Sequence, residues 1–472
     1  MKRYALLPLL GFATLAHADR PRWMTDGTVH VGSQVFATAH DYVTSDAFRA
    51  RGGRCGSEAP ERTDVASLIA PGDCATNVTV INPDYNDDRV LVIQVVFHVI
   101  KRADGVGDIS PALLQSQIDV LNEDFNAIMN TPGSAGSNTK LKFVLARYTP
   151  AGAPTVGYEV VTSDVYFDDP GSGGAANAMK TALNWDPTRY LNIYTNDANG
   201  LLGYATFPQQ SAGTSRDGVV VLWNSVGRNS PIGPPYNLGR TTTHEVGHYL
   251  GLFHTFQSGC GQTAAPYTSG DLIGDTNRES QANFGCTPAA SSCGGGMNPI
   301  ENYMDYSDDG CMTKFTVEQS NRVRCAIVNY RAINTEPKAL FTSAVDVLTA
   351  TFTNASTDVE SPTALVYNWD FGDGQKATDA NPVHVYAASG TYQVTLEVVD
   401  PGSGWNKQTQ AVTVEMPPMP PDAGNNGGGG GGDDDGSDGG GCCDANGAGP
   451  SYAALAFPVL LVLRRRRRRA KA

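Results

Sequence analysis

The sequence has no apolar run near its C-terminus that is long enough to cross a membrane. The stretch from Tyr452 to Leu463 covers only about half of the roughly 20 residues that a spanning helix needs. Positive charge is also scarce, because 34 Lys and Arg stand against 48 Asp and Glu, and the last nine positions hold six arginines and a lysine. Without that tail the chain is markedly acidic, which argues against nucleic acid as a partner.

The first segment of the chain, residues 1–18, is typical of a secretory signal peptide. Two basic residues precede an apolar run from Tyr4 to Leu15, and small residues follow before Asp19. A buried N-terminal helix is the alternative. If the signal is removed, the mature chain starts near Asp19 and folds in an oxidising compartment, where cysteines tend to pair.

The 472 residues exceed one compact core and favour two or three folded units. Residues 19–88 show little periodicity, as expected of a pro-segment or a loosely ordered leader. Strand and helix patterns alternate in residues 89–335, which predicts a mixed sheet with helices packed against it. The strand candidates are Arg89–Ile100, Leu141–Arg147, Leu191–Tyr194 and Gly218–Trp223; the helix candidates follow Ser110 and span Ala175–Trp185.

The C-terminal part divides into a small folded unit and two further segments. Residues 336–415 consist of short alternating strands separated by turn residues, a pattern typical of a β-sandwich. Residues 416–441 are rich in Pro, Gly and Asp and cannot bury enough apolar surface to fold, so we expect a disordered linker. Residues 442–472 hold two cysteines, the short apolar run and the arginine block, and are the candidate sorting or anchor signal.

The candidate metal-binding and catalytic residues lie in the stretch "TTTHEVGHYLGLFHTF", Thr241–Phe256. His244 and His248 are four residues apart, so on a helix both imidazoles project from one face and can bind one ion. Glu245 lies within reach of a water on that ion, as in the H-E-x-x-H arrangement of zinc peptidases. Gly251 can end the helix with a positive φ and turn the chain back to deliver His254 as a third ligand. The alternative is an amphipathic helix whose histidines lie in the core and are hydrogen-bonded within the protein.

The complete pattern H-E-x-x-H-x-x-G-x-x-H resembles the signature of metzincin peptidases, which includes a methionine turn further along the chain. "ENYMDYS" supplies Met304, and the resemblance implies that this methionine forms a hydrophobic floor beneath the metal. Tyr306 stands where several metzincins place a tyrosine that stabilises the tetrahedral intermediate. Each residue taken alone is more often an ordinary core or surface residue.

The segments "VVFHVI", "RYLNIYTND", "DGVVVLWNSVG" and "NYMDYSDDGCMTKFTVEQSNR" are similar, in this order, to the pappalysin (cytophagalysin) family of metzincins. That resemblance implies an α+β fold with a two-lobed, metzincin-like catalytic domain, and secreted zinc metalloendopeptidase activity on polypeptide substrates. A substrate strand would lie along the edge of the upper sheet, where an extended peptide can pair with a free edge.

The family resemblance also implies two disulfides, Cys260–Cys293 and Cys286–Cys311, although four cysteines allow three pairings and a second zinc cluster is the rival. Cys325 is left over. The loop "SGDLIGDTNRE" offers the oxygen atoms of Asp271, Asp275 and Thr276, which suit calcium, as in similar family members. A solvated acidic loop is the alternative.

In the leader, "RGGRCGSEAP" places Gly56 after Cys55 and resembles the cysteine-switch motif of pro-segments in this family. A thiolate is a strong zinc ligand and could take the place that the catalytic water needs, which would make the unprocessed chain a zymogen. A disulfide between Cys55 and Cys74 is the alternative.

The sandwich segment, with "YNWDFGDG", resembles the immunoglobulin-like PKD domain, in which Trp369 would be a core anchor and the role that of a spacer. The C-terminal layout resembles sorting signals of the MYXO-CTERM type, which implies contact with a cell-surface sorting machinery and attachment to the surface. The sequence therefore predicts a secreted or surface-tethered zinc endopeptidase. Its competitors are a catalytically silent scaffold that binds through the sandwich, and another metal hydrolase such as a cell-wall amidase.

Overall fold

A computed structural model describes residues 20–60, 90–168, 174–262, 266–288, 291–331, 337–358, 364–400 and 404–416. The predicted signal peptide, the linker from residue 417 onward, the sorting tail and Cys74 lie outside the described residues. Within the described residues, no helix combines the length and the apolar character needed to span a membrane.

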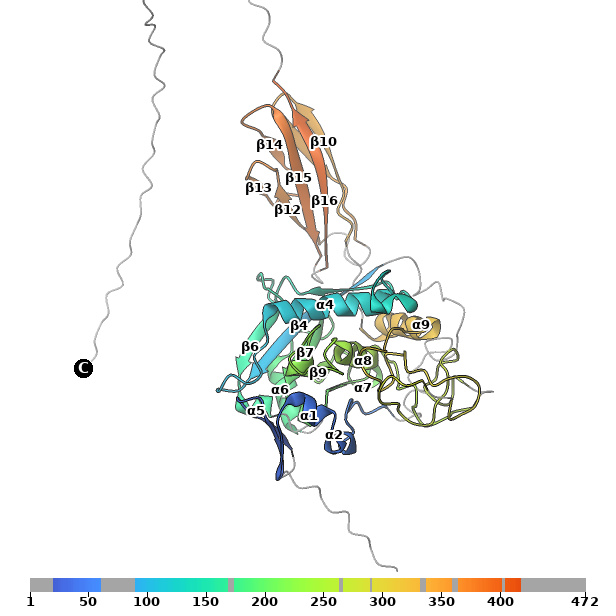
Figure 1. The fold of residues 1–472 in the computed structure, drawn as a ribbon. Helices are drawn as coiled ribbons and strands as arrows, with labels where there is room; N and C mark the ends of the chain where they lie inside the picture. Colours follow the sequence, from blue (N-terminus) through green and yellow to red (C-terminus); the bar gives the residue numbers. More distant parts are fainter. Residues whose placement is uncertain are drawn as a thin grey trace, which may run out of the picture. The chain divides into compact units, whose positions relative to one another are not determined.

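A six-stranded sheet forms the centre of the first large folded unit (Figure 1), in the order β5-β4-β7-β9-β8, with β6 also paired to β4. All pairings are parallel except that of β8 with β9, which is antiparallel. β8 is therefore an edge strand. The strands are β4 (Leu91–Lys101), β5 (Leu141–Leu145), β6 (Tyr158–Thr162), β7 (Tyr190–Asn196), β8 (Gly203–Ala205) and β9 (Val219–Leu222). The sequence patterns predict β4, β5, β7 and β9 but give no signal for β6 and β8.

Helices α4 (Pro111–Asn126) and α8 (Arg240–Tyr249) pack with the sheet around one core. In α4 the Ser110 side chain accepts the Leu113 N–H as an N-cap, and proline occupies the first turn, where it leaves no donor unpaired. Its apolar face and the buried helix α8 belong to the same apolar cluster as alternate strand residues. The remaining helices are α5 (Asp164–Phe167), α6 (Gly174–Leu183), α7 (Pro208–Ser211) and α9 (Val317–Ala326), with short helical turns η2 (Pro132–Ala135), η3 (Ala198–Gly200), η4 (Trp223–Ser225) and η5 (Ile327–Arg331).

The first part of the leader is folded, so the expectation of a loosely ordered segment is wrong for residues 20–60. It forms a three-stranded antiparallel sheet, β1 (Pro21–Trp23), β2 (Val29–Val31) and β3 (Gln34–Phe36), followed by α1 (Ala39–Val43) and α2 (Asp46–Ala50). Trp23, Tyr42 and Phe48 are buried in one cluster with Val220 and Leu222, which point to the opposite sheet face from Val219 and Val221. The leader covers that face with a few large side chains at irregular spacing, which leaves no periodicity in the sequence.

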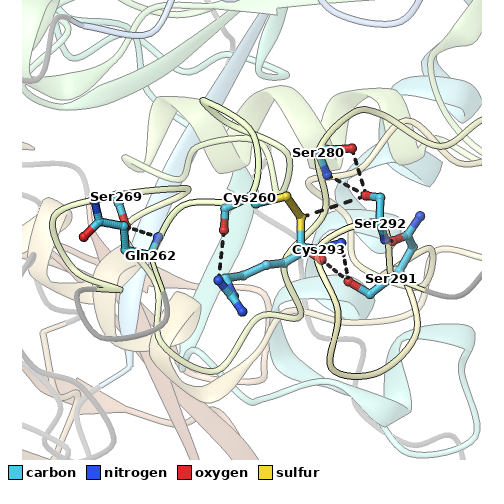
Figure 2. The surroundings of a disulfide bond; sticks show 9 residues. Cys260, Gln262, Ser269, Ser280, Ser291, Ser292 and Cys293 are labelled. Atoms are coloured by element: carbon cyan, nitrogen blue, oxygen red, sulfur yellow. Dashed lines mark hydrogen bonds between the residues drawn. A yellow bond between two sulfur atoms is a disulfide. The ribbon is translucent and has the colours of Figure 1, made fainter.

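The segment between α8 and α9 has little regular structure and is held by two disulfides, Cys260–Cys293 and Cys286–Cys311. These are the pairs that the family resemblance implied, and they leave no thiolates there for the rival zinc cluster. Around the first bridge, Ser292 Oγ accepts hydrogen bonds from the backbone and hydroxyl of Ser280 (Figure 2). Cys325 is also disulfide-bonded.

The second folded unit is a β-sandwich of two antiparallel sheets. One has the order β10-β11-β14 and the other β13-β12-β15-β16. Trp369 is buried in the apolar cluster between them, and its Nε1 donates to the carbonyl of Asp379 at 2.9 Å. The strands are β10 (Phe341–Asp346), β11 (Thr349–Asn354), β12 (Val366–Asp370), β13 (Lys376–Ala377), β14 (Val383–Val385), β15 (Gly390–Val399) and β16 (Trp405–Val414).

Candidate metal centre

Helix α8 and the turn after it bring three imidazoles to one point. His248 Nε2 lies 3.1 Å from His244 Nε2 and 3.0 Å from His254 Nε2. Gly251 has φ 89°, a left-handed conformation that costs glycine little, and it turns the chain so that His254 faces the helix. The structure thus places together the three histidines that the motif singled out.

Backbone carbonyls orient two of these rings. Nδ1 of His244 lies 2.7 Å from the carbonyl oxygen of Tyr303, and Nδ1 of His248 lies 2.7 Å from that of Leu252. Because a carbonyl can only accept, each Nδ1 carries the hydrogen and each Nε2 presents a lone pair. Burial lowers the pKa of His248 to about 4 and lowers that of His244 as well, so both rings are neutral and ready to bind a cation.

A buried carboxylate on α4 fixes the segment that orients His244. Asp124 accepts the hydroxyl of Tyr303 at 2.8 Å and the hydroxyl of Thr243 at 2.7 Å. Arg240 approaches the same carboxylate at 3.1 Å. Contacts of this kind commonly support metal-binding histidines. Asp124 was not among the predicted site residues, because only the fold brings it beside residues more than a hundred positions away.

Cys55 of the leader completes the cluster. Its thiol and the ligand atoms of the three histidines all lie within 4.8 Å of one another, and all four residues are buried. Cys55 is a free cysteine, so the alternative of a disulfide with Cys74 is wrong. Burial raises the pKa of the Cys55 thiol, and the charge of Glu245 raises it further, so a thiolate here needs a cation beside it.

The donor set fits a metal ion. Two imidazole lone pairs cannot hydrogen-bond to each other, so the close approach of His244 and His248 is best satisfied by a cation between them. Imidazole nitrogens and thiolates both bind Zn²⁺ in tetrahedral sites, so three neutral nitrogens and a thiolate fit this ion.

Glu245 lies beside the cluster with its carboxylate fully buried. Oε2 accepts the hydroxyl of Ser57 at 2.8 Å and lies 3.4 Å from the Cys55 Sγ, whereas Oε1 has no hydrogen-bond partner within the described part of the chain. Burial raises the pKa of Glu245 to about 8. A cation held by the three histidines would favour the ionised form of Glu245, whose open oxygen could then accept a proton.

Met304 packs against α8 at Gly247. It is fully buried, and a Cβ built on Gly247 would lie 2.5 Å from the Met304 Sδ. Because Gly247 has no Cβ, the Met304 sulfur can lie against the helix at this position, which falls between His244 and His248 in the sequence.

Replacing Gly247 with alanine is expected to destabilise the protein by about 1–3 kcal/mol, because the overpacking outweighs the gain in helix propensity. Thermal unfolding and the stoichiometry of bound zinc would both be measured. Gly310→Ala is the matched control, since nothing lies within 4 Å of its added Cβ. Equal stability of the two variants would contradict the packing described for Met304.

Tyr306 faces the same cluster from the segment after Met304. Its ring centroid lies 5.1 Å from that of His254, and its hydroxyl donates to the Cys55 carbonyl at 3.1 Å. The hydroxyl thus already binds a peptide carbonyl that lies beside the metal centre.

The leader residues around Cys55 lie along the free edge of the sheet. Cys55 forms a parallel bridge with Gly203 of β8, and the Gly56 N–H donates to the Gly203 carbonyl at 2.9 Å. The Ala205 N–H donates to the Ser57 Oγ at 2.8 Å. The leader thus occupies the edge on which the sequence analysis expected a substrate strand.

Arg54 precedes Cys55 and is completely buried. Its guanidinium donates to the Ser307 carbonyl at 2.6 Å and to Asp309 Oδ1 at 2.9 Å, and it lies over the Tyr236 ring. This pair was not predicted from the sequence. The arginine beside the candidate switch cysteine was the one available signal, and no local pattern marks Asp309.

The candidate calcium residues make two separate sets of contacts. Asp271 accepts the Thr276 hydroxyl at 2.6 Å, within one loop. Asp275 accepts the Thr316 hydroxyl at 2.6 Å and the Glu318 N–H at 3.0 Å, at the start of α9. Both carboxylates therefore have protein donors as partners.

Comparison with known proteins identifies both folded units. The profile of the family described as pregnancy-associated plasma protein-A, a peptidase family, matches residues 174–328, and the PKD domain profile matches residues 334–415. An extracellular metalloprotease 1 of Coccidioides posadasii is 38% identical over 249 residues, covering 51% of this chain and 78% of that protein. An extracellular metalloprotease of Colletotrichum graminicola is 36% identical, covering 59% and 91%.

Solved structures of similar sequence include Tannerella forsythia promirolysin, at 30% identity over 59% of this chain and 95% of that chain, with a TM-score of 0.47. The PKD1 domain of Vibrio anguillarum Epp is 35% identical over 18% of this chain and 99% of that chain, with a TM-score of 0.17. From the sequence relatives and the family profiles, this chain belongs to the pappalysin family of metalloproteases and carries a PKD domain after its catalytic domain.

Proposed function

We propose that the chain is a secreted zinc endopeptidase in which His244, His248 and His254 hold the metal. The convergence of their three Nε2 atoms is the observation that carries the proposal. Zinc bound there supplies Lewis acidity, which polarises a peptide carbonyl and makes water more acidic. The names of the extracellular relatives and the sequence of residues 1–18 support secretion.

Glu245 acts as the general base in this proposal. Once the leader and its Ser57 contact are gone, the carboxylate can accept a proton from the attacking water, and Oε1 already has no hydrogen-bond partner within the described residues. Tyr306 donates its hydroxyl to the oxyanion that forms at the scissile carbonyl, just as it donates to the carbonyl of Cys55 in the unprocessed chain.

In this proposal the leader keeps the enzyme inactive because it occupies the active site directly. The Cys55 thiolate would be the fourth ligand of the metal, and Ser57 binds the carboxylate of Glu245. Removal of the leader would free the fourth position, the base and the edge of β8 at once.

The test of this function is digestion of a mixed peptide library by the mature form, which lacks the leader. We expect cleavage within the peptides, loss of cleavage with a chelator, and recovery when zinc is added. A protein that holds zinc in full stoichiometry but cleaves no peptide would be the silent scaffold, and release of cell-wall amides without peptide cleavage would indicate the amidase.

The leader also suggests which residue flanks the scissile bond. Arg54 directly precedes Cys55, the leader residue at the metal centre, and its guanidinium group is paired with the buried carboxylate of Asp309. Once the leader leaves, this carboxylate can bind an arginine or lysine of a substrate. We therefore propose a preference for a basic side chain adjacent to the cleaved bond.

Asp309→Asn in the mature enzyme is expected to lower kcat/KM for arginine-containing peptides by about 10- to 100-fold, because a buried charge-assisted pair is lost. The asparagine Oδ1 can still accept the Leu238 N–H that Asp309 binds at 2.9 Å, so the start of α8 is preserved. The ratio of rates for peptides with arginine and with glutamine at that position is the readout. An unchanged ratio would contradict the role of Asp309.

Two further proposals concern calcium and the tail. Burial raises the pKa of Asp271 to about 7, and a cation near it would offset the cost of its charge. An increase in the unfolding temperature of the mature form with added calcium would support binding there. Attachment to the cell surface through residues 442–472 remains a prediction from the sequence.

A further inference from the structure

A cavity of about 330 Å³ lies beside β8, further along the leader than Cys55. Its walls include Glu58 of the leader, Lys180 of α6, Tyr204 and Thr206 at β8, and Arg216. We call this cavity the Arg216 pocket. Neither the metal chemistry nor the Asp309 pair uses these residues.

The path of the leader explains why Glu58 lines the pocket. Cys55 pairs with Gly203, and the Ser57 hydroxyl accepts the N–H of Ala205, so the two chains run side by side in the same direction. Glu58 follows next. A chain that lies on this edge therefore presents a side chain to the pocket about three residues from the metal, or roughly 10 Å away at strand spacing.

The charge of the pocket depends on the leader. Among the lining residues, Glu58 carries the one negative charge, whereas Lys180 and Arg216 are cations. Lys180 is buried, and its ammonium group is fixed by hydrogen bonds to the carbonyls of Arg216 and Gly218 at 3.1 and 3.4 Å. When the leader is removed, the pocket keeps both cations and loses its acid.

We propose that the Arg216 pocket is a substrate subsite for an acidic side chain, on the opposite side of the scissile bond from the basic residue that Asp309 binds. This inference rests on the proposed endopeptidase function. Among the lining residues that stay after the leader leaves, Lys180 and Arg216 carry positive charge and none carries negative charge, which favours a carboxylate and disfavours a lysine or arginine. The leader shows the same pairing, with Arg54 at Asp309 and Glu58 at the pocket.

Peptide substrates test the proposal with the mature enzyme. Each peptide carries one arginine beside the scissile bond and, at each position in turn on the other side, glutamate, glutamine or lysine. Both chain directions are included, because the leader does not fix the direction of a substrate. At the best position we expect kcat/KM to rank glutamate above glutamine above lysine, with about a three- to tenfold gain from glutamine to glutamate that shrinks at high salt.

A charge reversal identifies the pocket as the cause. In Arg216→Glu the ratio of glutamate to lysine peptides should fall by at least about tenfold. Arg216 is exposed, so the fold should tolerate the change. Lys407→Glu is the matched control, because it makes the same charge change at an exposed position on β16 of the sandwich and should leave the ratio unaltered.

Binding of leader peptides separates this inference from catalysis. The peptide of residues 54–60 should bind the mature protein more tightly than its Glu58→Lys version in calorimetry, by about three- to tenfold, and Arg216→Glu should reverse the order. Active enzyme with no ranking among glutamate, glutamine and lysine, in either direction, overturns the subsite. Absence of any peptide cleavage would instead count against the endopeptidase function itself.

Discussion

The mature Glu245→Gln variant is expected to bind zinc normally but to turn over peptides about a hundredfold to ten-thousandfold more slowly, the range in which general bases contribute. Glutamine has nearly the shape of glutamate, and the three imidazoles that would hold the metal are untouched. Its amide cannot accept a proton from water at neutral pH, so the chemical step fails while substrate binding persists. The measurements are metal content, kcat and KM.

His248→Ala provides the comparison for that variant. It removes the imidazole that lies within 3.1 Å of both others, so zinc itself should be lost together with activity. Wild-type turnover in Glu245→Gln would exclude this residue as the base. Loss of zinc in both variants would show that Glu245 acts on the metal instead.

The second large effect concerns the unprocessed chain, in which Cys55→Ala should create activity before the leader is removed. Among the described residues of the leader, Cys55 is the one whose ligand atom joins the three histidines, and without its thiol the fourth metal position would be open. A cleavage-resistant form of the full chain keeps the leader covalently attached during the assay. We expect its activity to rise from background by about a hundredfold or more, because a strong thiolate ligand no longer competes with water.

Ser57→Ala is the matched control for the switch. It removes the hydrogen bond to Glu245 and the contact with Ala205 but leaves the thiol in place, so the unprocessed chain should stay silent. If Cys55→Ala is as silent as the wild type, steric cover by the leader, rather than metal ligation, keeps the enzyme inactive.

The metal centre could be predicted from the sequence because its key residues are local. His244, Glu245 and His248 are set by the geometry of one helix, and Gly251 delivers His254 a single turn later. The same holds for α4, whose capping serine, first-turn proline and apolar face occur in one continuous stretch. The mixed sheet with packed helices followed from the alternation of such local patterns, and the two-lobed α+β fold followed from the resemblance to the family.

The parts that could not be predicted depend on contacts between distant segments. The Arg54–Asp309 pair joins residues 255 positions apart, and Asp124 reaches Tyr303 across 179. β8 has three residues, too few for a period, and its place at the sheet edge depends on pairing with β9. Only the fold shows that Gly203 is needed there, because a Cβ on it would lie 2.8 Å from the Glu245 Cγ.

X-ray absorption at the zinc edge, recorded for the unprocessed and the mature protein, tests the central claim most directly. We predict one zinc per chain in both forms. In the unprocessed form it should have three nitrogen neighbours at about 2.0–2.1 Å and one sulfur at about 2.3 Å, and in the mature form the sulfur should be replaced by oxygen. Absence of zinc, or a coordination shell without three imidazole nitrogens, would contradict the account.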